Sequence, residues 1–160
     1  MILANTFHVV VIKNNWLANL SIPISAKAFG KNKTLRGFLV LPFFSGSLAL
    51  IFSYALGPFV ESHLTDSFIG LGLGLSYLIS ELPNSFIKRR LGIKNGEHSK
   101  KYRLFQVFVD KTDSLIGMLL FYYFATSVQF KTIVELYFIA FLLSITTSFI
   151  LHSIKLKKSF

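Results

Sequence analysis

The stretch SFIGLGLGLSYLISELPNSFIKRR, residues 67–90, is an apolar run that ends in three consecutive cations, Lys88, Arg89 and Arg90. About 20 apolar residues are enough for a helix to cross the hydrocarbon core of a bilayer. Cations directly after such a run are typical of the cytoplasmic end of a membrane helix. The stretch therefore predicts a membrane helix whose cations either anchor it or also hold a negatively charged ligand.

The composition of the whole chain agrees with a membrane protein. Of the 160 residues, 52% are hydrophobic and 16% aromatic, and the mean hydropathy of +0.58 is too high for a soluble domain of this size. The net charge of +10 is gathered in short segments between apolar runs, which favours a polytopic membrane protein and argues against nucleic acid as a partner. Because cysteine is absent and the four histidines lack ligand-like spacing, we expect neither disulfides nor a His-bound zinc or iron.

Five apolar stretches predict an all-α integral membrane protein, a single domain over residues 1–160 built as a bundle of about five transmembrane helices. The first stretch contains Lys13, Asn14 and Asn15, so we expect a partial, tilted or re-entrant element there. The stretches are Ile2–Leu20, Gly37–Leu56, Ser67–Leu82, Phe105–Ala125 and Thr132–Ile150.

Loop charges predict the orientation of this bundle. Fourteen cations lie in two alternate loops and the C-terminal segment, whereas the remaining loops hold Lys131 alone. The positive-inside rule then places the C-terminus in the cytoplasm and the N-terminus outside, in a multi-pass protein of the cell inner (plasma) membrane. The cations are Lys27, Lys31, Lys33 and Arg36, then Lys88, Arg89, Arg90, Lys94, Lys100, Lys101 and Arg103, then Lys155, Lys157 and Lys158.

Glycine and proline in the opening stretch predict two local features. Gly70 and Gly74 have the Gly-x-x-x-Gly spacing that suits close helix packing, and Gly72 lies between them. Pro83 has no N–H to donate and is expected to kink or end the helix.

Two of the seven acids, Asp110 and Asp113, lie inside the fourth apolar stretch. A charge at the centre of a membrane helix costs about 2.5–3.5 kcal/mol on insertion scales. Positions i and i+3 share a helix face, so both carboxylates can point at one place, where Mg²⁺ is commonly held together with substrate phosphates. Glu81 is a third candidate for the same metal site. The alternative is that Asp110 pairs with a basic neighbour, Asp113 caps a helix and Glu81 is solvated.

The segment FGKNKTLRGF, residues 29–38, is a candidate oxyanion site. Lys33 and Arg36 lie one helical turn apart, and Gly30 and the residues Asn32–Thr34 supply further donors. The segment is not a P-loop, because it lacks the contiguous Gly-Lys-Thr and a preceding strand. A solvated loop is the alternative. Carboxylates for a metal, basic segments for phosphates and a membrane-embedded body together indicate an enzyme that joins a cytosolic phosphate compound to a lipid.

Three ordered motifs resemble the CDP-archaeol synthase family, relatives of the CDP-diacylglycerol synthases (phosphatidate cytidylyltransferases). They are PISAKAFGKNKTLRGF at residues 23–38, ELPNSFIKRRLGIKNG at 81–96 and FQVFVDKTDSLIG at 105–117. The resemblance implies transfer of CMP from CTP to a lipid phosphate with Mg²⁺, on the cytoplasmic side of the membrane, with release of pyrophosphate.

The resemblance also implies roles for individual residues. The metal ligands would be Asp110, Asp113 and Glu81, and the catalytic residues Asp110, Asp113, Lys88 and Lys33. The phosphate-binding residues would be Asn32, Lys33, Thr34, Arg36, Gly37, Ser85, Lys88 and Arg89, with Arg90 as an anchor.

The implied partners are CTP, a lipid phosphate acceptor and the membrane lipids, with a homodimer as one option for the assembly. Three residues depart from the usual family pattern: Leu35 replaces a Trp, Ser25 replaces an acid, and Glu81 stands where many members have Asp. The acceptor therefore stays open between an archaetidic-acid-like lipid and phosphatidate. A CDP-alcohol phosphotransferase is excluded because its Asp-Gly-x-x-Ala-Arg run is missing. The remaining alternative is a small polytopic membrane scaffold or transporter with basic cytoplasmic anchors and no catalytic activity.

Overall fold

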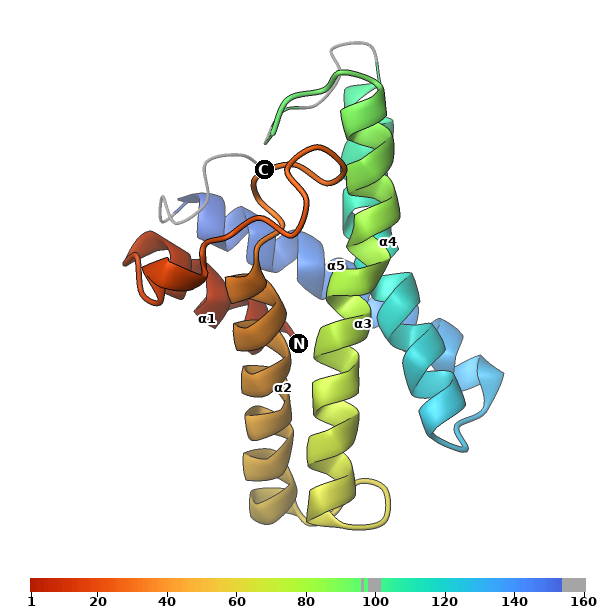
Figure 1. Ribbon diagram of the computed structural model, residues 1–160. Coiled ribbons are helices and arrows are strands. Elements are labelled where there is room, and N and C mark those ends of the chain that lie inside the picture. The colour runs from red at the N-terminus through yellow and green to blue at the C-terminus, as the bar shows by residue number, and fades with distance from the viewer. Residues whose placement is uncertain (96, 98–101, 154–160) are drawn as a thin grey trace.

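The computed structural model describes residues 1–95, 97 and 102–153, and this part of the chain is helical with no strand (Figure 1). The five α-helices confirm the predicted all-α class, and an isolated bridge between Pro23 and Thr34 ties the first long loop together. The helices are α1 (Ile2–Lys13), α2 (Leu35–Leu56), α3 (His63–Arg90), α4 (Arg103–Ala125) and α5 (Phe130–Ser153), with a 3₁₀ turn, η1 (Ala18–Leu20), after α1.

The first apolar stretch was predicted too long. Helix α1 ends at Lys13 after 12 residues, and at 1.5 Å per residue it is about 18 Å long, too short to cross about 30 Å of hydrocarbon. The helix does not continue because Asn15 and Leu17, just after it, take up left-handed backbone conformations. The prediction of a partial first element is confirmed, whereas its boundary at Leu20 was wrong.

Helices α2 and α3 form a long antiparallel hairpin held by glycine contacts, as the spacing predicted (Figure 1). A Cβ on Gly74 would lie 2.5 Å from Pro42 Cα, and one on Gly70 would lie 2.6 Å from Ala49 Cβ. The opposite face of α3 receives α4, where a Cβ on Gly72 would overlap the ring of Phe121. The three glycines therefore let α3 pack tightly on both neighbours.

Pro83 does not end its helix. Helix α3 continues past it to Arg90 and reaches 28 residues in all, longer than the predicted stretch Ser67–Leu82. Because Pro83 has no N–H, only one backbone hydrogen bond of the helix is lost, and the helix retains extensive packing against α2 and α4. This continuation is what carries Asn84, Ser85 and Lys88 along the same rod as Glu81.

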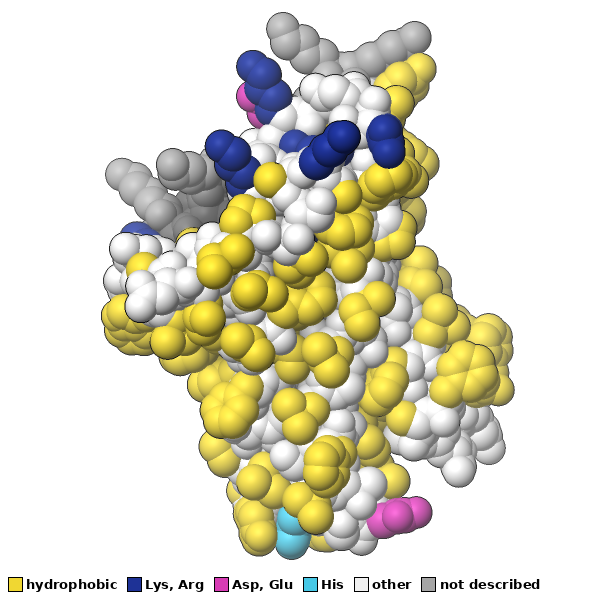
Figure 2. All heavy atoms as spheres, in the orientation of Figure 1, with side chains coloured by type: hydrophobic (Ala, Val, Ile, Leu, Met, Phe, Trp, Pro, Cys, Tyr) yellow, Lys and Arg dark blue, Asp and Glu magenta, His cyan; other side chains and the backbone are white. Residues whose placement is uncertain are grey.

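Two of the described helices, Leu35–Leu56 and Phe130–Ile150, are long and apolar enough to cross a membrane. Helix α5 leaves most of its apolar length unburied, with Leu142 65% exposed. Figure 2 shows the same character over a wide flank, where apolar side chains cover the visible surface. Lys and Arg gather at one end of the molecule, where the loop before α2 and the end of α3 lie (Figures 1 and 2). The predicted loop cations Lys100, Lys101, Lys155, Lys157 and Lys158 lie outside the described residues.

Candidate active site

Asn84 of α3 joins the two carboxylates of α4. Its Nδ2 donates to Asp110 Oδ1 at 2.6 Å and to Asp113 Oδ2 at 2.8 Å. Two like charges repel each other in a partly buried site, and an amide with two N–H groups can donate one to each. The Asp-x-x-Asp pair thus converges on one place, as the i, i+3 spacing predicts. Sequence reasoning did not assign Asn84, although it lies one helical turn before Lys88 on the same face of α3.

Lys88 lies against the same carboxylate pair. Its Nζ is 2.5 Å from both Asp110 Oδ1 and Asp110 Oδ2. Ser85 lies between Asn84 and Lys88 on α3 and is half-buried. A lysine ammonium is a mobile point charge with three donors, so Lys88 can remain near Asp110 and still contact a phosphate oxygen. The structure therefore combines a dicarboxylate with a cation that is available for an anionic ligand.

Glu81, the third predicted metal ligand, contacts a cation from another segment of the chain. It forms an ion pair with Lys33, which reaches α3 from the loop before α2. No group of three His, Cys, Asp or Glu side chains in the described residues is arranged to hold a metal ion. In the structure Lys33 pairs with Glu81, while Asn84 links Asp110 to Asp113, and the role of Glu81 as a metal ligand stays a prediction.

The two basic segments meet at this end of the bundle. Arg89 donates to Asn95 Oδ1 at 2.8 Å, and Gly30, with φ +85°, packs so closely that an added Cβ would lie 2.2 Å from the same oxygen. Only a glycine fits this backbone conformation and spacing. Arg90 instead lies 5.0 Å above the ring of Phe86 on an exposed face, in keeping with the anchoring role predicted for it.

Arg36 and Gly37 begin α2 and are both buried. Arg36 donates to the carbonyl oxygen of Trp16 at 3.0 Å, which ties α2 to the turn that follows α1. The N–H of Gly37 donates to Thr34 Oγ1 at 3.4 Å, as expected of an N-cap threonine. These three residues were predicted to bind phosphate, and the structure uses each of them to build the start of α2.

Replacing Arg36 with Gln is therefore expected to lower stability and leave the binding of a phosphate ligand unchanged. A hydrogen bond from a charged donor contributes about 1.5–3 kcal/mol, and here it links two segments of chain. The measurement is the thermal midpoint of the purified protein, with Arg90→Gln as an exposed control. A folded Arg36→Gln variant with selectively weakened binding of a phosphate ligand would show that Arg36 binds phosphate.

A small cavity of about 80 Å³ brings α1 to the Lys33–Glu81 pair. It is lined by Asn5 and His8 of α1, and by Asn32 and Lys33 of the loop. Burial and then nearby cations lower the pKa of His8 to about 4, so its imidazole is neutral. His8 Nε2 is buried and has no hydrogen-bond partner among the described residues. Sequence reasoning did not assign Asn5 and His8 to the site, although their i, i+3 spacing places them on one face of α1.

Residues 5–160 match the family of CarS-like CDP-archaeol synthases. The chain belongs to the CDP-archaeol synthase family. A CDP-archaeol synthase of Staphylothermus marinus is 35% identical over 98 residues, which is 60% of this chain and 48% of the relative. The match thus spans about half the length of this curated relative. No solved structure matches the chain.

The carboxylate pair of this CDP-archaeol synthase family member fits the Mg²⁺ that the resemblance implies. Asp110 and Asp113 offer four hard oxygen donors, and the Asn84 amide holds the two carboxylates together. Mg²⁺ is usually bound through one or two carboxylates plus substrate phosphates, without a complete cage of protein ligands. A pair of aspartates is therefore enough to hold this ion, because the substrate phosphates would complete its coordination.

Proposed function

We propose that the chain is a CTP-dependent cytidylyltransferase that transfers CMP from CTP to a lipid phosphate and releases pyrophosphate. The observation that carries the proposal is the convergence of Asp110, Asp113 and Lys88 around Asn84, at the basic end of a bundle with an apolar flank. Membership of the CDP-archaeol synthase family supports the reaction class.

The chemistry requires little from the protein beyond positioning and charge. A phosphate monoester is largely ionised near pH 7, because its second pKa is about 6. Its oxygen attacks the α-phosphorus of CTP, and the bond from that phosphorus to the bridging oxygen of the β-phosphate breaks with its electron pair. No strong general base is needed. Lys33 and Lys88 then act on the negative charge that develops on the leaving pyrophosphate.

Asp110 and Asp113 would hold Mg²⁺, which when bound supplies charge neutralisation at the phosphates of CTP. Asn84 is a positioning residue that keeps the two carboxylates together. Lys33 and Lys88 are each paired with a carboxylate in the structure, Glu81 and Asp110 respectively. Both ammonium groups can turn toward phosphate oxygens without leaving the site, because lysine side chains are long and flexible.

The proposed setting is the cell inner membrane, crossed several times, with the basic end and the active site in the cytoplasm. The apolar flank and the cluster of cations at one end support this orientation. The acceptor is a glycerophosphate lipid, either of the archaetidic-acid type or phosphatidate. A soluble nucleotide and a membrane lipid would meet at this end, where the polar site borders the apolar surface.

The test is CMP transfer from radiolabelled CTP by the protein purified in detergent, with and without Mg²⁺. The acceptors are an archaetidic-acid-type ether lipid phosphate, phosphatidate and neutral diacylglycerol. We expect a CDP-lipid from at least one phosphate and none from diacylglycerol. Failure with every lipid phosphate would favour the alternative function, a membrane scaffold or transporter without catalysis.

A further inference from the structure

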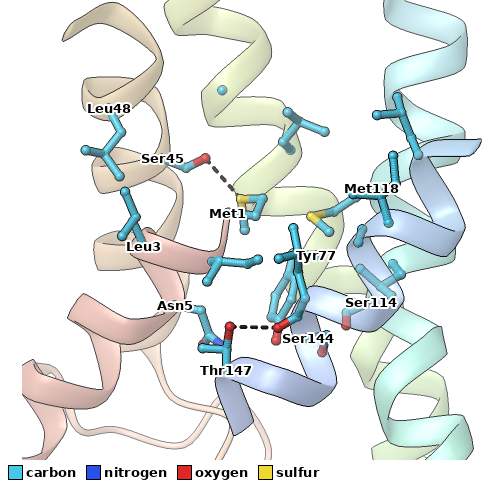
Figure 3. A pocket seen from close by; sticks show the side chains of 18 of the residues that line it. Met1, Leu3, Asn5, Ser45, Leu48, Tyr77, Ser114, Met118, Ser144 and Thr147 are labelled. Atoms are coloured by element: carbon cyan, nitrogen blue, oxygen red, sulfur yellow. Dashed lines mark hydrogen bonds between the residues drawn. The ribbon is translucent and has the colours of Figure 1, made fainter. Parts of the chain in front are cut away.

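A cavity of about 720 Å³ lies between α5 and the other helices (Figure 3). Its walls are mostly apolar, with Leu73 of α3, Met118 of α4 and Leu143 of α5 among them. The shape and lining are those of a site for a hydrocarbon chain rather than for a nucleotide, since a nucleotide would leave its polar groups unpaired.

The cavity has a group of polar side chains at one end, and Ser45, whose hydroxyl bonds to Met1, is a further polar residue elsewhere in its lining (Figure 3). The group at the polar end consists of Tyr77, Ser114, Ser144 and Thr147, while Met118 lies farther along the cavity (Figure 3). The polar end adjoins the candidate active site, because Asp113 Oδ1 accepts a hydrogen bond from the Ser114 N–H at 2.6 Å. An amphipathic molecule with its polar group at this end would therefore present that group to the carboxylate pair.

Lys111 provides a cation beside this end. It precedes Ser114 by three positions and Met118 by seven, so all three lie on the same face of α4. Its Nζ donates to the hydroxyl of Ser148 on α5, and Ser148 itself lines the cavity. A half-buried lysine within a long apolar helix is costly, and such residues usually mark a ligand site or an ion pathway.

We propose that Lys111 and this cavity form the binding site of the lipid acceptor. The Lys111 ammonium holds the phosphate monoester, the hydroxyl groups of Ser114 and Ser148 add hydrogen bonds, and a hydrocarbon chain occupies the apolar part. The identity of the lipid rests on the proposed function. The inference adds the location of the acceptor site, which is formed by residues of α4 and α5. Lys33 and Lys88 are then left for the phosphates of CTP.

The charge arrangement explains why the acceptor needs its own cation. A lipid phosphate placed beside Asp110 and Asp113 meets two negative carboxylates. Lys88 already contacts Asp110, so a further positive charge on the cavity side lowers the repulsion. Lys111 is adjacent to Asp110 in sequence, and its ammonium donates to Ser148 of α5, which lines the cavity.

The first test measures lipid binding directly, as the thermal shift of the full-length protein in detergent. The probes are dioleoyl phosphatidate, dioleoylglycerol and sn-glycerol 3-phosphate. For Lys111→Met we expect the phosphatidate concentration at half-maximal shift to rise at least tenfold, with the dioleoylglycerol response unchanged. Lys131→Met, at a side chain that is 84% exposed, is the matched control. Lys111→Arg retains the charge and should restore most of the binding.

The second test fills the cavity. Ala140 lines it on α5, so Ala140→Phe should weaken phosphatidate and dioleoylglycerol alike, whereas Leu142→Phe on the exposed side should change neither. The inference is overturned if Lys111→Met, or Ala140→Phe, binds phosphatidate as the wild type does, or if sn-glycerol 3-phosphate binds as tightly as phosphatidate.

Lysine-dependent lipid binding without any CMP transfer would refute the proposed function alone. CMP transfer with an unaltered KM for phosphatidate in Lys111→Met would refute this inference alone.

Discussion

Replacing Asp110 with Asn is expected to reduce CMP transfer by at least about a hundredfold, the scale on which losing a single charge-stabilising group acts in other active sites. The carboxylate has two functions in the structure. It is held by Asn84 and Lys88, and it forms one half of the pair proposed to hold Mg²⁺. The neutral Asn side chain keeps the shape of Asp but has one oxygen in place of two charged carboxylate oxygens. The variant should therefore position the metal ion and the phosphates poorly.

The measurement is the initial rate of CDP-lipid formation over a titration of Mg²⁺. The Mg²⁺ concentration at half-maximal rate should rise together with the fall in rate. Glu135→Gln, an exposed acid on α5 that lies 4.0 Å from Lys131, is the control and should behave as the wild type. An Asp110→Asn variant that retained more than half of the activity would rule out the carboxylate pair as the centre of the reaction.

Replacing Gly74 with Ala is expected to destabilise the protein by about 1–3 kcal/mol, the usual cost of overpacking a tight contact. The new Cβ would lie 2.5 Å from Pro42 Cα and 3.0 Å from Pro42 N. Both are backbone atoms of α2, which cannot rotate away as a side chain can. The two helices must therefore move apart, which also shifts Tyr77 and Glu81, one and two turns farther along α3.

The measurement is the thermal midpoint in detergent, which for a chain of this size should fall by about 2–4 °C for each kcal/mol. Ala55→Val enlarges an exposed side chain near the end of α2 and serves as the control. CMP transfer should fall with the midpoint, because the hairpin carries Glu81 and Asn84. An unchanged midpoint in Gly74→Ala would show that the two helices tolerate a wider separation.

Much of the fold could be predicted from local patterns. Apolar runs located α2, α4 and α5 to within a few residues, and glycines spaced by four indicated that α3 packs closely against a neighbouring helix. The errors came where a local signal competed with packing. Pro83 is a helix breaker in isolation, yet helix α3 extends to Arg90 because it packs against helices on two sides. The polar residues after Lys13 ended α1 earlier than hydropathy alone suggested.

The candidate site was predictable in its composition and not in its pairing. Spacing placed Asp110 and Asp113 on one face, and that convergence is what the structure has. Spacing alone could not show that Asn84 would link them, or that Glu81 would pair with Lys33. Each of these contacts joins different segments of the chain, and the geometry between segments depends on how the helices cross.

The amino-acid sequence by itself determined the helical class, the apolar flank, the basic end and the acids available for a metal. These properties follow from how single side chains partition between water and hydrocarbon and from the period of a helix. Only the tertiary structure decided which cation meets which acid, that Arg36 is buried in support of α2, and that Lys111 bonds to Ser148 in the lining of a cavity between α5 and the other helices. Those outcomes depend on distances of a few ångströms between residues far apart in the chain, because hydrogen bonds and ion pairs form only at such distances.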